Sequence, residues 1–167
     1  MASRDPYAFR QLTPSDLPVL KDVLRLFGDA FNDVATYQHV VPGDAYLSQL
    51  LAKPHFIAVS ALLGGEVVGA IAAYVLDKFE QERSEIYVYD LAVLERHRRK
   101  GVATGMLTLL KRIAAERQAY VIFIEADRGD APAIALYESF GTREDVLHFD
   151  IDPLVAHPAS ARKKTRG

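Results

Sequence analysis

A basic run beside a glycine is the part of this sequence whose chemistry most directly indicates a ligand. It consists of Arg98, Arg99, Lys100, Gly101, Val102 and Ala103. A helix is predicted to begin at Gly101, and the free N–H groups and positive dipole end of a helix start bind phosphate. Gly101 lets the backbone approach a ligand closely, and the cations add charge-assisted contacts. The run indicates a phosphate site, while a solvated basic helix start remains the alternative.

Two common nucleotide motifs are excluded for the same run. A Walker loop would end in Gly-Lys-Ser/Thr, and this run does not. A dinucleotide fingerprint would contain a second early glycine, which is also missing. The phosphate ligand, if one binds here, is therefore of another class.

Asp90 is a carboxylate inside an otherwise apolar run, residues 85–94. Burying an ionised carboxylate costs free energy unless the group has a partner or a function. The alternatives are a structural ion pair, a hydrogen-bonded buried aspartate and a chemical role. Strand alternation predicts Tyr87 and Tyr89 on the face opposite Asp90, an assignment that a β-bulge would alter.

Periodicity and turn residues predict the elements that position these groups. The predicted strands are 7–12, 56–63, 67–76, 85–94, 120–125 and 146–151, with a Gly-Gly hairpin turn at 64–65. The predicted helices cover 17–27, 44–52, 101–117 and 131–140, the last capped by Asp130, and 28–43 is a loop with a helical turn. The order β-α-α-β-β-β-α-β-α-β predicts an α/β fold (α+β mixed sheet), antiparallel first and parallel where a helix crosses over. The run 120–125 is typical of a buried strand.

Composition limits the classes of function. The chain has 167 residues, a net charge of -2 and no cysteine, which excludes disulfides, thiolate metal sites and cysteine nucleophiles. We expect one domain over residues 1–152, a disordered tail over 153–167 and a cytoplasmic location, with no membrane span. Basic residues outnumber acidic ones seven to two in 95–117, and acidic residues outnumber basic ones eight to two in 125–152. One segment suits an anion and the other a cation.

Three motifs, in order and on the expected elements, resemble the GNAT superfamily of N-acetyltransferases. Arg98-x-x-Gly101-x-Ala103 resembles its acetyl-CoA pyrophosphate motif, and 90–93 resembles its fourth strand. The run 135–141 resembles its late helix, which ends in Tyr-Glu-x-x-Gly. The resemblance implies the GNAT acyl-CoA N-acyltransferase fold, with acetyl-CoA as co-substrate.

The resemblance also implies roles for individual residues. Asp90 would act as the base or orient the amine, and Tyr137 would protonate the leaving thiolate. The N–H groups of Leu91 and Val93 would pair with pantetheine and polarise the carbonyl. The expected acetyl-CoA contacts are Leu91, Ala92, Val93, Arg98, Arg99, Lys100, Gly101, Val102, Ala103, Thr104, Asp130, Ala133 and Tyr137. Many relatives carry Asn near Asp130, so that residue keeps a capping role but lacks an amide donor.

A narrower resemblance concerns the acceptor. Segments 26–28, 33–37, 72–76, 78–81, 84–87, 89–93 and 148–152 are similar to the aminoglycoside 3-N-acetyltransferases that confer gentamicin resistance. An aminoglycoside carries several ammonium groups, so carboxylates suit it. The expected acceptor contacts are Asp33, Tyr74, Glu80, Glu82, Tyr89, Asp90, Glu125, Asp127, Asp150 and Asp152.

The predicted partner is thus a small-molecule aminoglycoside, with no nucleic acid, no membrane and a homodimer left open. The five histidines lack metal-ligand spacing, so we expect no catalytic metal. Two alternatives remain: a GNAT enzyme for a polyamine or a peptide N-terminus, and a non-catalytic acyl-CoA-binding regulator.

Overall fold

One five-stranded sheet organises the computed structural model, which describes residues 6–154. The strands lie side by side in chain order: β1 (Ala8–Gln11), β2 (Phe56–Leu63), β3 (Glu66–Lys78), β4 (Arg83–Val93) and β5 (Ala119–Ile124). Neighbouring strands are antiparallel from β1 to β4, whereas β4 and β5 are parallel. The predicted mixed α/β sheet is confirmed, and the parallel pair occurs where a helix connects its strands.

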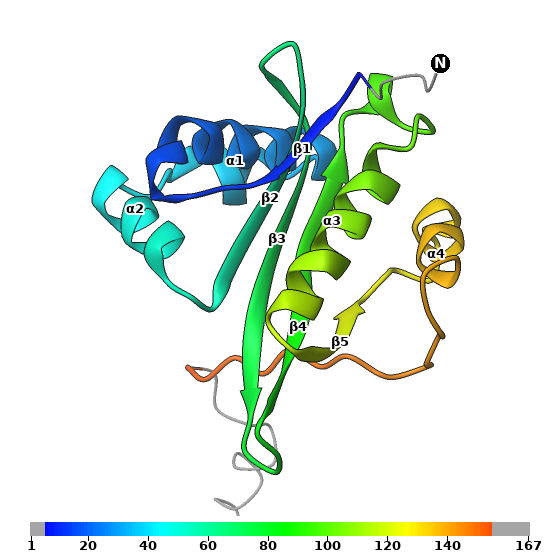
Figure 1. Cartoon of the computed structure of the whole chain (residues 1–167). Coiled ribbons are helices and arrows are strands. Elements are labelled where there is room, and N and C mark those ends of the chain that lie inside the picture. Colours follow the sequence, from blue (N-terminus) through cyan, green and yellow to red (C-terminus); the bar gives the residue numbers. More distant parts are fainter. Residues whose placement is uncertain (1–5, 155–167) are drawn as a thin grey trace, which may run out of the picture.

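Helices cover both faces of this sheet (Figure 1). On one face, α1 (Leu17–Phe31) and α2 (Asp44–Ala52) bury apolar side chains such as Leu20, Phe27 and Leu47. On the other, α3 (Val102–Glu116) buries Met106 and Leu110 against the strands. The shorter α4 (Ala131–Glu138) follows β5. Three short turns complete the order: η1 (Pro14–Asp16), the π-helical η2 (Ala35–His39) and η3 (Glu95–His97).

Gly105 brings the first half of α3 close to β1. A Cβ atom at this position would overlap the ring of Phe9. Any larger residue would therefore require the Phe9 ring to move. Because the ligand-binding loop predicted from the sequence directly precedes α3, this close contact also fixes where that loop lies.

Two predictions about the C-terminal part of the chain are wrong. Residues 146–151 form no strand, and their apolar side chains are open to solvent, with Phe149 75% and Ile151 87% exposed. The strand β5 is not buried either, because no further strand of residues 6–154 pairs with its outer edge. Its side chains Tyr120, Val121 and Phe123 are exposed as a result. Apolar residues with strand-like alternation form a buried strand only where another strand accepts their hydrogen bonds and other elements cover their side chains.

The predicted domain and tail remain predictions. Pro153 and Leu154 lie in a turn, and residues 155–167 lie outside the described part of the chain. None of the helices in residues 6–154 combines the length and the apolar character needed to cross a membrane.

Candidate active site

A β-bulge in the middle of β4 decides which way Asp90 faces. Ala72 of β3 pairs with Asp90, but the next residue, Ala73, pairs with Val88, so β4 has one extra residue at this point. Tyr74 pairs with Tyr87, and it lies two residues from Ala72 on the same face of β3. Asp90 therefore shares a face with Tyr87. The prediction of opposite faces is wrong because the bulge breaks the strict alternation.

Tyr89, at the bulge, lies on this face as well. Its ring meets those of Tyr74 and Tyr87 edge-on, with centroids 6.2 and 5.6 Å apart, respectively. The side chain of Tyr89 nevertheless remains 64% exposed. The bulge therefore presents a phenol to solvent directly beside the candidate base.

Asp90 is held by a phenol and not by a cation. The Tyr37 hydroxyl donates to Asp90 Oδ1 at 2.9 Å, and no ion pair within residues 6–154 includes Asp90. The carboxylate is half-buried, and this burial raises its pKa, although the Tyr37 hydrogen bond lowers it in part. A carboxylate with a raised pKa and no counter-ion is suited to accept a proton.

A row of aromatic rings crosses the sheet next to Asp90. It contains Phe56, Tyr74, Tyr89, Tyr87 and Phe123, which come from four strands. Tyr87 stacks on Phe123 with ring centroids 4.8 Å apart, and Phe56 lies 5.4 Å from Tyr74. Phe56 is buried, and the other four rings offer apolar faces for a ring-shaped ligand and hydroxyl groups for its polar substituents.

Two predicted acceptor carboxylates meet at the β5 end of this row. His148 contacts Glu125 through Nδ1 at 2.8 Å and Asp150 through Nε2 at 3.1 Å. Both carboxylates raise the pKa of His148 from its ordinary value of 6.5. The Tyr87 hydroxyl makes a longer contact of 3.5 Å with Glu125. The structure thus places Glu125 and Asp150 on the two ring nitrogens of one imidazole.

Three other predicted acceptor carboxylates lie on loops, and none of them bonds to His148 within residues 6–154. Asp33 lies just before η2 and accepts from the Thr36 N–H at 3.1 Å. Asp152 caps a turn at the Leu154 N–H, and Asp127 lies in the loop before α4. Each carboxylate is on the surface of a loop, so its contact with an acceptor remains a prediction.

Glu80 and Glu82 occupy the turn between β3 and β4. Glu80 pairs with Lys78 at 3.8 Å and with Arg83 at 3.5 Å. Along β3 this turn is about 20 Å from the position of Asp90, from the usual rise per strand residue. Within one chain these two carboxylates and Asp90 therefore occupy separate regions.

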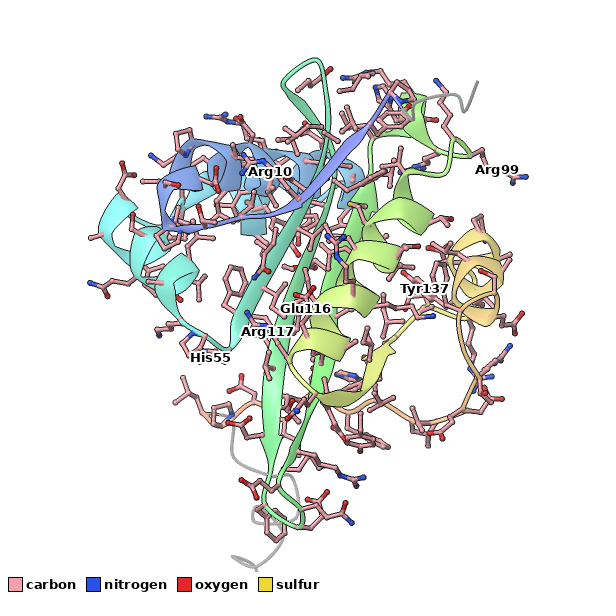
Figure 2. All side chains as sticks on the ribbon, in the orientation of Figure 1. Arg10, His55, Arg99, Glu116, Arg117 and Tyr137 are labelled. Atoms are coloured by element: carbon pink, nitrogen blue, oxygen red, sulfur yellow. The ribbon has the colours of Figure 1, made fainter. Side chains whose placement is uncertain are left out.

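The helix start at α3 has the backbone geometry that the sequence indicated. Gly101 caps the helix with a φ of 81°, in the left-handed region that favours glycine. No side chain caps the helix, so the N–H groups of Val102, Ala103 and Thr104 have no capping partner. Figure 2 shows Arg99 extending outward from this loop. The loop can therefore present backbone donors and cations to an anion.

Arg98 has a partner within the protein, because its Nε donates to the Val93 carbonyl at 3.1 Å. This contact ties the basic loop to the end of β4. The guanidinium's remaining N–H groups are on an exposed side chain. Arg98 therefore positions the loop in addition to any ligand contact.

The second half of β4, after Val88, has an open edge. Its pairing with β5 ends at Val88 and Ile124. The Leu94 N–H donates to the carbonyl of Val68 in β3. Along a strand of an antiparallel ladder, every second N–H points to the same neighbour. The N–H groups of Leu91 and Val93 therefore point away from β3, toward the open edge. This is the orientation required for pairing with an extended ligand.

Tyr137 lies on the face of α4 that packs against the core around α3. Asp130 caps α4 by accepting from the Ala133 N–H at 3.0 Å, as predicted. Tyr137 is half-buried, and burial together with the Asp130 charge raises its pKa to about 12. Figure 2 places the side chain between α4 and α3. The phenol is thus protonated at neutral pH and can donate a proton.

Sequence reasoning gave no role to Tyr37, Tyr87 or His148. Tyr37 lies 53 positions from Asp90, and His148 lies 23 positions from Glu125. The acidic stretch 125–152 and the isolated Asp90 were signals for this region, but neither signal names a contact partner.

The comparisons with known proteins bear on this geometry. Residues 20–142 match the model of the acetyltransferase (GNAT) family. The chain belongs to the GNAT family. A solved aminoglycoside acetyltransferase, HMB0005 from an uncultured soil metagenomic sample, is 52% identical to this GNAT protein, with a TM-score of 0.86; the match covers 87% of this chain and 97% of that one.

Two further relatives differ in what they act on. The aminoglycoside acetyltransferase meta-AAC0020, from an uncultured soil metagenomic sample and solved with sisomicin, is 28% identical with a TM-score of 0.81; the match covers 87% of this chain and 95% of that one. The NAA10 catalytic subunit of the N-terminal acetyltransferase A complex of Arabidopsis thaliana is 34% identical over 97 residues, 55% of this chain and 47% of that protein. The chain spans about half the length of the curated relatives that it matches.

Proposed function

We propose that this GNAT protein transfers the acetyl group of acetyl-CoA to the 3-amino group of a gentamicin-type aminoglycoside, and thereby confers antibiotic resistance. The observation that carries the proposal is Asp90, a carboxylate without a counter-ion, facing a row of aromatic rings that ends at Glu125 and Asp150. A ring-shaped polycation matches apolar faces flanked by carboxylates. The 52% identity to an aminoglycoside acetyltransferase supports the same acceptor.

The residues around α3 and β4 fit acetyl-CoA, which supplies an activated acetyl thioester. The uncapped first turn of α3, with Gly101 in the left-handed conformation, would hold the pyrophosphate. Lys100 and Arg99 would add charge to that contact. The N–H groups of Leu91 and Val93 would pair with the pantetheine arm at the open edge of β4. Fixed backbone donors suit this task because they require no reorganisation during the reaction.

Asp90 would prepare the acceptor amine. An ammonium group cannot attack, so its proton must leave before or during the formation of the carbon–nitrogen bond. Asp90 Oδ2 has no hydrogen-bond partner within residues 6–154 and is the oxygen available to take that proton. Direct attack in a ternary complex then requires only that the amine be held beside the thioester.

Tyr137 would protonate the leaving group of the transfer. When the carbon–sulfur bond breaks, the departing thiolate needs a proton, and a phenol that stays protonated at neutral pH can donate one. The remaining charges would be met by Glu125 and Asp150, with Tyr74 and Tyr89 against the rings of the acceptor. Asp33, Glu80, Glu82, Asp127 and Asp152 would add further electrostatic attraction for a polycation.

A panel of amines tests the proposal. The protein is incubated with acetyl-CoA and gentamicin, sisomicin, kanamycin, spermidine or a peptide, while thiol release is followed and the acetylated nitrogen is located by NMR. We expect the aminoglycosides to be preferred, with acetylation at the 3-amino group.

The similarity to NAA10 makes the peptide the strongest competitor in this panel. Preferential acetylation of the peptide or of spermidine would replace the proposed acceptor. Acetyl-CoA binding without turnover on any amine would instead favour a regulator.

A further inference from the structure

We propose that Tyr37 is a positioning residue for the acetyl transfer: its hydroxyl fixes Oδ1 of Asp90 and leaves Oδ2 as the oxygen that receives the amine proton. This inference rests on the proposed function, since it assigns a task to a residue behind the candidate base. The contact joins η2 to the bulge of β4 across 53 positions of sequence.

Tyr37 is itself held firmly in place. Its ring packs against Phe27 and Phe31 of α1, with both centroid distances 5.8 Å. Asn32 ends α1 in the left-handed conformation, and the following Asp33 N–H donates back to Gly28 at 2.9 Å. The chain thus turns at the end of α1 and lays η2 along the helix. A phenol supported on two rings loses little entropy when it donates to Asp90.

The surroundings of Asp90 make this single bond important. The titratable groups that face the carboxylate are the phenols Tyr37, Tyr74 and Tyr87, with Tyr89 adjacent in the chain. The charge of Asp33 also raises the pKa of Tyr37, and no cation within residues 6–154 pairs with Asp90. Hence the Tyr37 hydroxyl is the one described group that favours the ionised form of Asp90 against burial.

The phenol can act only as a donor in this pair. Burial and the neighbouring Asp90 raise the pKa of Tyr37 far above its usual value of 10.0. The proton therefore stays on the phenol while Asp90 cycles between its charged and neutral forms. Oδ1 of Asp90 therefore accepts the Tyr37 hydrogen bond in both protonation states of the carboxyl group. The pKa of Asp90 consequently depends on the Tyr37 hydroxyl.

The test replaces Tyr37 with phenylalanine, which keeps the ring packing and removes the hydroxyl. Hydrogen bonds to charged groups are worth enough to shift the pKa of the acceptor by about one unit. Removing the bond raises the pKa of Asp90, so the acid limb of kcat/KM for gentamicin should move up by about one pH unit. On that limb the variant should be slower by about tenfold, with KM for acetyl-CoA unchanged.

Tyr120→Phe is the matched control. Tyr120 also donates its hydroxyl to a carboxylate, Glu85, but it does so on the outer strand β5. This control variant should keep the wild-type pH profile. A structural role of Tyr37 alone would lower Tm and leave the acid limb in place, which would overturn the proposal.

Two further measurements keep the test decisive. In the Asp90→Asn background, Tyr37→Phe should have little additional effect on kcat/KM, and fully additive losses would overturn the proposal. If Tyr37→Phe fails to fold, 3-fluorotyrosine at position 37 provides a stronger donor and should move the acid limb down. An unmoved limb in the fluorinated protein would also contradict it.

A carboxyl titration separates this proposal from the proposed function. With ¹³C-labelled aspartate, the signal of Asp90 is assigned by its loss in Asp90→Asn, and its pKa is followed without any substrate. We expect a higher value in Tyr37→Phe than in the wild type. An unchanged value overturns the positioning role, whereas a shifted value together with no gentamicin acetylation overturns only the proposed acceptor.

Discussion

Replacing Asp90 with asparagine removes one negative charge from the acceptor site and keeps the shape of the side chain. The asparagine oxygen can still accept from the Tyr37 hydroxyl, now as a neutral hydrogen bond. That change weakens the bond by about 1 kcal/mol. Against this loss, the variant no longer buries an ionised carboxylate, whose burial is the larger influence on the pKa of Asp90.

The raised pKa gives the sign of the stability effect. A carboxyl whose pKa is higher in the folded than in the unfolded state contributes stability below the unfolded value of 3.8, and this contribution is lost as pH rises through the folded pKa. At pH 7 the ionised Asp90 therefore works against folding. We expect Asp90→Asn to have a Tm at pH 7 equal to or above that of the wild type, measured by calorimetry.

The same substitution should lower the rate of acetylation, although it does not lower the stability. General base catalysis is typically worth about 100- to 10,000-fold, so kcat/KM for gentamicin should fall within that range, while the Kd for acetyl-CoA stays within about twofold. If Asp90 is the base, high pH should partly restore the rate because more of the amine is neutral. If Asp90 only orients the amine, the defect should persist.

Two results would refute this reasoning about Asp90. A stable asparagine variant with wild-type kinetics on gentamicin at every pH would remove Asp90 from the mechanism. A lower Tm with normal kinetics would return Asp90 to a structural role. In either case Glu125 and Asp150, around His148, would be the next carboxylates to examine.

Three other substitutions test the remaining parts of the site. Tyr137→Phe should lower kcat by about 100-fold or more at unchanged acetyl-CoA affinity; a wild-type kcat would leave Tyr137 with a packing role only. Gly101→Val should weaken acetyl-CoA binding, measured by calorimetry, by about tenfold, because the strained loop can no longer present its N–H groups. The control Gly64→Val strains a left-handed turn between β2 and β3 and should leave the acetyl-CoA affinity intact. At pH values below the ordinary His148 pKa of 6.5, the charged contacts of His148 should stabilise residues 145–152, and this stabilisation should be lost as pH rises through the raised pKa. Hydrogen-exchange protection factors in this segment, which are corrected for the intrinsic pH dependence of exchange, should therefore fall with rising pH in the wild type and be low at every pH in His148→Gln. Wild-type protection factors that do not change with pH would contradict this expectation.

Local features of the site could be read from the sequence because they depend on neighbours along the chain. The glycine at position 101, the helix after it and the cap at Asp130 each require only a few consecutive residues, and the structure has all three. The same holds for the hairpin turn and for the amphipathic α3. Their periodicity and turn chemistry directly reflect backbone geometry.

The last strand and the side of β4 on which Tyr87 lies could not be read in this way. A run such as 146–151 has strand-like alternation, but a strand exists only where another strand accepts its hydrogen bonds. The bulge at Tyr89 is a mismatch between two strands, and a single strand's sequence does not contain it. One extra residue turned Asp90 to the face of Tyr74 and Tyr87.

The sequence by itself determined the elements up to α4, the mixed sheet and the presence of an isolated carboxylate beside a phosphate-type helix start. Only the tertiary structure decided that Asp90 is bonded to Tyr37 and faces a row of aromatic rings, and that His148 joins Glu125 to Asp150. The physical reason is distance along the chain. Backbone propensity acts over a few residues, whereas these contacts join segments that only strand register, the bulge and helix packing bring together.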